Sequence, residues 1–171
     1  MSHDLSSEKP STRAITAGRL VRQADSELNA SISLNSTFTA GGPIGYGRYG
    51  NQTWSQTESA ISALEGGRTL IFSSGMAAIS AAFSILPLGS TVVASNQGYS
   101  GVMTLLNEMH ANKRVVVKFV DIAKTEEVLA ALPGADLLWL ESPTNPCLDV
   151  AELPALISAA RAAKILVMVD N

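Results

Sequence analysis

From residue 52 onward, short apolar runs alternate with helical segments, and this alternation constrains the fold more than any other feature of the sequence. The apolar runs are unbroken, as at residues 137–140 and 165–169, instead of alternating with polar residues. Strands buried on both faces have this composition, and they occur in parallel sheets whose connections pass through helices. The sequence therefore predicts an α/β fold with a mostly parallel sheet and helices on both faces.

The predicted elements follow one another without an internal repeat. Glycine and proline mark their ends, with Gly66 and Gly67 after the first helix and Pro87 after the second. Residues 1–50 show no clear periodicity, and we interpret them as an extended arm that ends in a glycine-rich loop. We expect strands at residues 69–72, 90–94, 114–120, 137–140 and 165–169, and helices at residues 53–64, 75–86, 100–110, 125–132 and 150–163.

Composition narrows the class of protein. Hydrophobic residues make up 46% of the chain and the net charge is −3, with no basic stripe, so we expect no nucleic-acid partner. The apolar runs are too short to span a membrane, and the polar first eleven residues lack the apolar segment of a signal peptide. Cys147 is the single cysteine, which permits no internal disulfide and fits the cytoplasm. No spacing of metal-ligating residues predicts a metal site.

Polar groups follow several predicted strands, at the edge where parallel sheets bind ligands. Ser74, Gly75 and Met76 open a helix directly after the strand expected at residues 69–72. Free backbone N–H groups and the helix dipole make such a turn an anion site. A serine that caps the helix beside a packing glycine explains the same motif equally well, so both interpretations stay open.

Three further residues stand at predicted strand ends. Tyr99 can stack on a planar ring, or it can be a partly buried surface tyrosine. Asn145 lies between two prolines, which restrict the backbone around an amide that can donate or accept hydrogen bonds. Asp170 closes a strand of five apolar residues, where a carboxylate needs a partner such as a protonated ring nitrogen; a helix cap is the alternative.

The glycine-rich loop carries a tyrosine and an arginine two residues apart, Tyr46 and Arg48. A guanidinium and a phenolic hydroxyl in this spacing suit a phosphate group. An exposed loop pair without a ligand is the alternative interpretation.

Together these motifs resemble one family, the Cys/Met-metabolism enzymes that depend on pyridoxal 5'-phosphate (PLP), the group of cystathionine γ-synthase and cystathionine γ-lyase. The resemblance implies the PLP-dependent transferase fold of type I, similar to aspartate aminotransferase and here truncated. Residues 1–50 would be its N-terminal arm and loop, and residues 51–171 the first part of its large PLP-binding domain. The matching segments keep the family's order: Tyr46-Gly47-Arg48-Tyr49-Gly50-Asn51, Leu64-Glu65-Gly66-Gly67, Ser73-Ser74-Gly75-Met76-Ala77-Ala78, Glu141-Ser142-Pro143-Thr144-Asn145-Pro146 and Val169-Asp170-Asn171.

The resemblance assigns the phosphate of the cofactor to two places in the chain. The backbone amides of Gly75 and Met76, with Ser74 beside them, are similar to those that hold the phosphate within one subunit. Tyr46 and Arg48 look like the pair that reaches into a neighbouring subunit's site and binds the phosphate there.

The resemblance assigns the pyridine ring to three residues. Tyr99 looks like the aromatic residue that stacks on the ring, the catalytic contribution implied for this chain. Asn145 is similar to the asparagine near the ring hydroxyl. Asp170 looks like the partner of the ring nitrogen, which keeps the ring an electron sink.

The implied activity is γ-elimination or γ-replacement on sulfur amino acids or activated homoserine. The family is expected to act as a cytoplasmic homotetramer, a dimer of active dimers, on small amino-acid substrates. Its Schiff-base lysine lies beyond the Asp-Asn pair, so we expect residues 1–171 to be inactive alone; a non-catalytic remnant or partner subunit of the same fold is the alternative. None of the five lysines is well placed to substitute: Lys9, Lys113, Lys118, Lys124 and Lys164.

Two local departures from the family pattern leave these expectations in place. Gln52 stands where the family usually has proline, and Thr16 where it usually has histidine. A phosphate- or nucleotide-binding module without catalysis is a further alternative, but no Gly-x-Gly-x-x-Gly fingerprint follows a strand.

Overall fold

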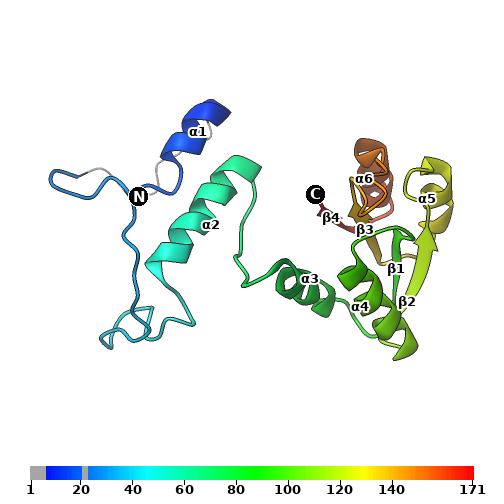
Figure 1. Cartoon of the computed structure of the whole chain (residues 1–171), viewed down its shortest axis with the longest axis horizontal. Helices are drawn as coiled ribbons and strands as arrows, with labels where there is room; N and C mark the ends of the chain where they lie inside the picture. Colours follow the sequence, from blue (N-terminus) through cyan, green and yellow to red (C-terminus); the bar gives the residue numbers. More distant parts are fainter. Residues whose placement is uncertain (1–6, 21–22) are drawn as a thin grey trace. The chain divides into compact units, whose positions relative to one another are not determined.

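The computed structural model describes residues 7–20 and 23–171, which divide into two units, Met1–Ser73 and Ser74–Asn171 (Figure 1). Each unit is described by itself. Residues 1–6, which belong to the stretch where no signal peptide is predicted, lie outside the described residues. Among the described residues, no helix has both the length and the apolar character needed to cross a membrane.

The first unit contains a predicted helix and a short one that the sequence pattern did not reveal. The predicted helix is α2 (Gln52–Glu65), which begins where the Asn51 side chain accepts a hydrogen bond from the Thr53 N–H at 2.8 Å. It ends at Gly66, whose φ of 72° is the left-handed conformation typical of helix ends. The unpredicted helix is α1 (Pro10–Thr16), which buries none of its residues and so lacks the apolar periodicity that marks a helix in a sequence.

The expected buried strand at residues 69–72 is wrong. The segment forms no strand, and Leu70, Ile71 and Phe72 are exposed. A strand is stable only when a neighbouring strand pairs with its backbone, and here the backbone bonds to side chains of α2 instead. Ser62 Oγ accepts from the Thr69 N–H, and Glu58 accepts from the Ile71 N–H.

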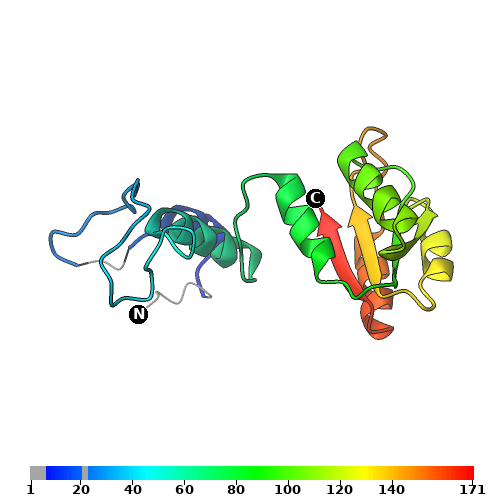
Figure 2. The same ribbon diagram turned by 90° about the horizontal axis from the view of Figure 1, so that it is seen from below.

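The second unit is a four-stranded parallel sheet with the strand order β2-β1-β3-β4 (Figures 1 and 2). The other four predicted strands are confirmed to within one residue at each end, and helix α6 begins three residues later than expected. The elements are α3 (Gly75–Ser84), β1 (Ser90–Ser95), α4 (Ser100–Ala111), β2 (Val115–Val120), α5 (Thr125–Ala131), β3 (Leu137–Glu141), α6 (Leu153–Ala162) and β4 (Leu166–Asp170).

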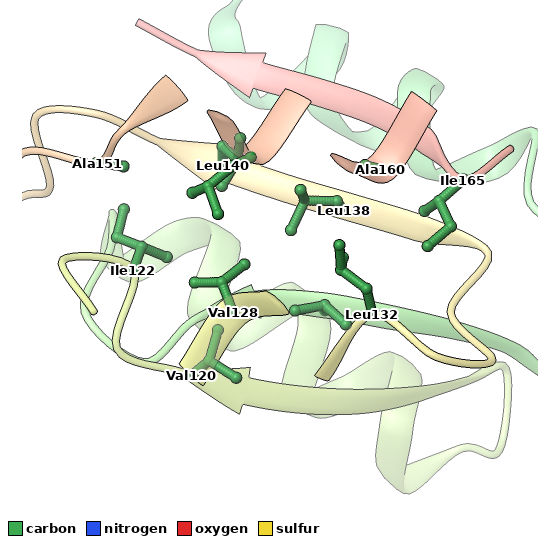
Figure 3. Close-up of a cluster of buried hydrophobic side chains, with 11 residues drawn as sticks. Val120, Ile122, Val128, Leu132, Leu138, Leu140, Ala151, Ala160 and Ile165 are labelled. Carbon is green, nitrogen blue, oxygen red and sulfur yellow. The ribbon is translucent and has the colours of Figure 1, made fainter. Parts of the chain in front are cut away.

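Helices cover both faces of this sheet, as predicted. On one face, Val92 and Trp139 of the sheet pack with α3 and α4, and the Phe83 ring lies 4.9 Å from the Trp139 ring. On the other face, Leu138 and Leu140 pack with α5 and α6 (Figure 3). Because successive side chains of a strand point to opposite faces, β3 contributes to both cores and all five of its residues are buried.

Candidate active site

The amino end of α3 combines a capped helix with free backbone donors. Ser74 Oγ accepts from the Ala77 N–H at 3.1 Å, so this serine is the helix cap. Within the described part of the chain, the N–H groups of Gly75 and Met76 have no hydrogen-bond partner. A Cβ atom added to Gly75 would meet nothing within 4 Å, which rules out a packing role for this glycine. The turn can therefore receive an anion, although it follows an irregular segment and not the strand expected there.

Tyr99 lies beside the amino end of α3. It is the residue that precedes α4, and its side chain is 42% exposed. Its ring packs over Gly101, where an added Cβ atom would lie 2.7 Å from Tyr99 Cε1 and 3.0 Å from Met76 Sδ. A side chain at position 101 would displace both groups. Glycine at this position therefore allows the Tyr99 ring and the first turn of α3 to pack close together.

Glu141, the last residue of β3, connects two of the predicted site residues. Its side chain is buried, and its two carboxylate oxygens accept from the Tyr99 N–H at 3.0 and 2.9 Å. One of the same oxygens accepts from the Asn145 N–H at 3.0 Å. No role was assigned to Glu141 from the sequence. The argument applied to Asp170, a carboxylate at the end of a buried strand that needs partners, would have pointed to it.

The loop that carries Asn145 is closed by its own hydrogen bonds. Thr144 and Asp149 exchange backbone and side-chain bonds of 2.9 and 3.0 Å, and Ser142 Oγ accepts from the Ala151 N–H. These bonds hold the backbone of the loop, while the Asn145 side chain is exposed and free to contact a ligand. The loop is therefore restrained by more than its two prolines.

Asp170 stands next to Glu141 across the sheet, because β3 and β4 pair in parallel with these two residues in register. Residues in register on parallel strands point to the same face, so Asp170 lies on the face covered by α3 and α4, with Trp139 and Met168. The Asp170 side chain is partly exposed at the carboxyl end of the sheet. It is the last residue of β4, and not a residue of a loop beyond it.

Tyr46 and Arg48 belong to the first unit, and the structure brings them together with each other. The Arg48 guanidinium lies 5.0 Å from the centre of the Tyr46 ring, and both side chains are exposed. The Gly47 N–H bonds to the Ser36 carbonyl at 2.6 Å, and an added Cβ atom at Gly47 would lie 3.1 Å from Ser36 Cα. This close approach of two backbone segments explains why glycine separates Tyr46 from Arg48.

The four lysines of the second unit lie away from Tyr99, Asn145 and Asp170. Lys113 and Lys164 precede β2 and β4, at the amino edge of the sheet, and Lys118 Nζ bonds to the carbonyls of Ala131 and Pro133 at the end of α5. Lys124 forms an ion pair of 3.0 Å with Asp121 beyond β2. The described residues contain no group of three or more His, Cys, Asp or Glu arranged to hold a metal ion.

The sequence profile of the family described as Cys/Met metabolism PLP-dependent enzyme matches residues 11–171. The chain belongs to this family. A putative cystathionine gamma-lyase of Streptomyces coelicolor is 43% identical over 136 residues, which cover 76% of this chain and 34% of that protein. A cystathionine gamma-synthase of Mycobacterium bovis is 36% identical over 173 residues, which cover 95% of this chain and 44% of that protein.

The crystal structure of metB from Corynebacterium glutamicum superposes with a TM-score of 0.89 at 32% identity and covers 99% of this chain and 46% of that one. The expected fold, the family and its cofactor, pyridoxal phosphate, are thereby confirmed. The chain spans less than half the length of these relatives. The roles of individual site residues stay predictions.

The residues of the second unit fit the cofactor chemically. The free N–H groups and the open space at Gly75 suit the phosphate, and the half-exposed Tyr99 ring suits a planar heterocycle. The exposed Asn145 amide and the Asp170 carboxylate suit the ring hydroxyl and the ring nitrogen.

Proposed function

We propose that the protein carrying this sequence is a PLP-dependent enzyme that performs γ-elimination or γ-replacement on sulfur amino acids or activated homoserine. One observation carries the proposal: the amino end of α3, Tyr99, Asn145 and Asp170 all gather around the carboxyl end of the β1, β3 and β4 strands. Open α/β sheets bind ligands at this end.

Each of these groups has a distinct task in the proposed enzyme. The N–H groups of Gly75 and Met76 bind the phosphate, and Tyr99 holds the ring by stacking. Asp170 keeps the proton on the ring nitrogen, because a nearby carboxylate stabilises the charged form of a base. The bound cofactor supplies an electron sink for the bond broken at the substrate's α-carbon.

The reaction class is tested with purified protein that carries these residues together with a Schiff-base lysine, offered two sets of substrates. γ-Elimination breaks the Cγ–S bond of cystathionine and predicts release of cysteine, with 2-oxobutanoate and ammonia formed from the remaining part after hydrolysis. γ-Replacement predicts consumption of an activated homoserine only when a thiol such as cysteine is also present. Turnover of neither set by protein that binds pyridoxal phosphate would refute the enzymatic proposal.

The Asp170→Asn variant tests the ring-nitrogen role. Asparagine keeps the size of the side chain and removes its charge, so turnover should fall roughly 100-fold, the usual effect of losing one placed electrostatic group. The matched control is Asp149→Asn, a carboxylate of the same unit whose side chain makes no hydrogen bond within the described residues. Equal turnover by both variants would remove Asp170 from the mechanism.

We further propose a homo-oligomer in the cytoplasm, in which Tyr46 and Arg48 of one subunit bind the phosphate in its neighbour's site. Their exposure and their mutual contact support this role, and the single exposed thiol, Cys147, fits a reducing compartment. Mixed oligomers of Arg48→Ala and Asp170→Asn subunits test it. Such a mixture forms some sites with both residues intact and should regain activity that neither variant has; no recovery would refute sharing between subunits.

The second candidate function is a non-catalytic partner subunit of the same fold. Within the second unit, none of the four lysines accompanies Tyr99, Asn145 and Asp170. A partner subunit binds pyridoxal phosphate only reversibly, so borohydride treatment leaves no cofactor on the protein. An enzyme with a Schiff-base lysine retains the reduced cofactor through dialysis, which separates the two candidates.

A further inference from the structure

Glu141 is a buried carboxylate whose charge is stabilised by backbone donors. It is 6% exposed, and the described residues give it no cationic partner. Its bonds come from the N–H groups of Tyr99 and Asn145, which are 42 and 4 residues away along the chain. The Tyr99 N–H lies at the amino end of α4, where a negative charge also interacts favourably with the helix dipole.

The surroundings of Glu141 leave its carboxylate little freedom. A Cβ atom added to Gly98 would lie 2.9 Å from Glu141 Oε2, whereas its next neighbours, Glu141 Cδ and Met103 Sδ, would be at 3.7 and 3.8 Å. Gly98 is therefore the place where the backbone before Tyr99 touches the carboxylate. A side chain there would meet the carboxylate and little else.

We propose that Glu141 is a positioning residue of the cofactor site. Its carboxylate holds the backbones of Tyr99 and Asn145 at a fixed distance from each other. This inference rests on the proposed function, in which Tyr99 stacks on the cofactor ring and Asn145 faces its hydroxyl. One carboxylate bonded to both backbones fixes the two sides of the ring site together. The N–H groups of Gly75 and Met76, which are proposed to bind the phosphate, make no hydrogen bond to Glu141.

The side-chain chemistry of Glu141 makes the proposal specific. A carboxylate has two acceptor oxygens, and both are used here. Glutamine keeps one acceptor but turns an NH₂ donor toward the backbone N–H groups, so at least one bond is lost. The Glu141→Gln variant therefore loosens the ring site while it keeps the size of the side chain.

The test measures equilibrium binding of three probes to the purified protein: pyridoxal phosphate, pyridoxal without the phosphate, and inorganic phosphate. In Glu141→Gln, the affinity for both pyridoxal compounds should fall roughly tenfold, which corresponds to about 1.4 kcal/mol. Affinity for inorganic phosphate should stay unchanged. The visible circular dichroism of bound pyridoxal phosphate, which reports the asymmetric surroundings of the ring, should weaken as well.

Further variants separate the proposed role of Glu141 from a general loss of fold. Gly98→Ala pushes on the carboxylate alone and should reproduce the loss of pyridoxal affinity, and adding it to Glu141→Ala should cause no further loss because the clash is gone. Glu152→Gln is the matched control, since Glu152 is exposed and makes no side-chain cap bond at the start of α6. Its binding constants should equal those of the unaltered protein.

The outcomes separate the inference from the function on which it rests. If the unaltered protein fails to bind pyridoxal phosphate, the proposed function falls and this inference falls with it. If it binds, and Glu141→Gln and Gly98→Ala bind both pyridoxal compounds equally well, only the positioning role is overturned. A parallel loss of inorganic phosphate binding would show that Glu141 supports the fold in general, and would overturn the inference too.

Discussion

Ser74 combines two roles that substitutions can separate. Its side chain caps α3 by accepting from the Ala77 N–H, and it adjoins the free N–H groups of Gly75 and Met76. Ser74→Ala removes the cap and leaves the backbone donors in place. Ser74→Asp keeps a capping oxygen, since aspartate is as good a cap as serine, and adds a negative charge beside the proposed phosphate site. The two variants should therefore change stability and cofactor binding in different proportions.

The exposure of Ser74 sets the size of both effects. Loss of a cap costs about 0.5–2 kcal/mol, and a value near 1 is expected here because water can reach the freed Ala77 N–H. Two like charges about 5 Å apart in water repel by about 0.8 kcal/mol, and a phosphate carries nearly two charges. Ser74→Asp should thus weaken phosphate binding by about 1.5 kcal/mol, roughly twelvefold, with no loss of stability.

Chemical denaturation and cofactor titration, run on the same preparations at low salt, test this prediction. Ser74→Ala should shift the free energy of unfolding and leave the affinity for pyridoxal, which has no phosphate, unchanged. Ser74→Asp should unfold like the unaltered protein and lose affinity for pyridoxal phosphate only, an effect that added salt reduces. Equal affinity of Ser74→Asp for pyridoxal phosphate, or an equal loss for pyridoxal, would refute an anion site at this turn.

Three further predictions concern the second unit. Leu138→Ala should lower the free energy of unfolding by about 2–5 kcal/mol, because Leu138 is fully buried in β3. Val116→Ala should lower it by about 0.5 kcal/mol or less, because Val116 is an exposed residue of β2. Similar values in a denaturation series would contradict the described core. Lys118→Met should lower the free energy of unfolding by about 1 kcal/mol, because the bonds from Lys118 to the end of α5 are lost. A titration should show unchanged pyridoxal phosphate binding; weakened binding would show that Lys118 contributes to the cofactor site. The hydrogen bond from Lys124 lowers the pKa of Asp121. The ion pair therefore stabilises the folded protein above the ordinary pKa of 3.8, and this stabilisation is lost as the pH falls through the lowered pKa. Lys124→Gln should raise the pKa of Asp121 in an NMR titration, and an unchanged pKa would refute the ion pair.

The sheet could be predicted from the sequence because its strands are buried by helices whose boundaries are also visible. The run at residues 137–140 is apolar throughout, and β3 is indeed buried on both faces. The run at residues 69–72 looks the same in the sequence, yet its side chains are exposed. A local apolar run shows that a segment favours burial. Whether a neighbouring strand pairs with the segment depends on tertiary structure, which the run itself does not reveal.

The sequence predicts the site residues that follow the general rule for strand ends, but it does not predict the role of Glu141. The strand-end rule selects Tyr99, Asn145 and Asp170, because parallel topology brings the carboxyl ends of strands together. With a strand expected at residues 137–140, Glu141 is the first residue of the following loop. As the last residue of β3, it continues the alternation of Leu137 and Trp139, which places it on the α4 face. A strand that ends at residue 140 leaves the direction of the Glu141 side chain undefined, whereas a strand that includes Glu141 fixes it.

The comparisons separate two questions: how the cofactor is bound and which reaction is performed. A relative named as a lyase and a relative named as a synthase both match this part of the chain, at 43% and 36% identity. Both relatives carry names from a family that depends on pyridoxal phosphate. The contacts of Glu141 fix the backbones of Tyr99 and Asn145 and leave both side chains free for a ligand, so the proposed positioning role concerns the cofactor site and not the choice of reaction. Binding measurements on this part therefore test the cofactor site directly, and the choice between elimination and replacement is a separate question for the substrate assays.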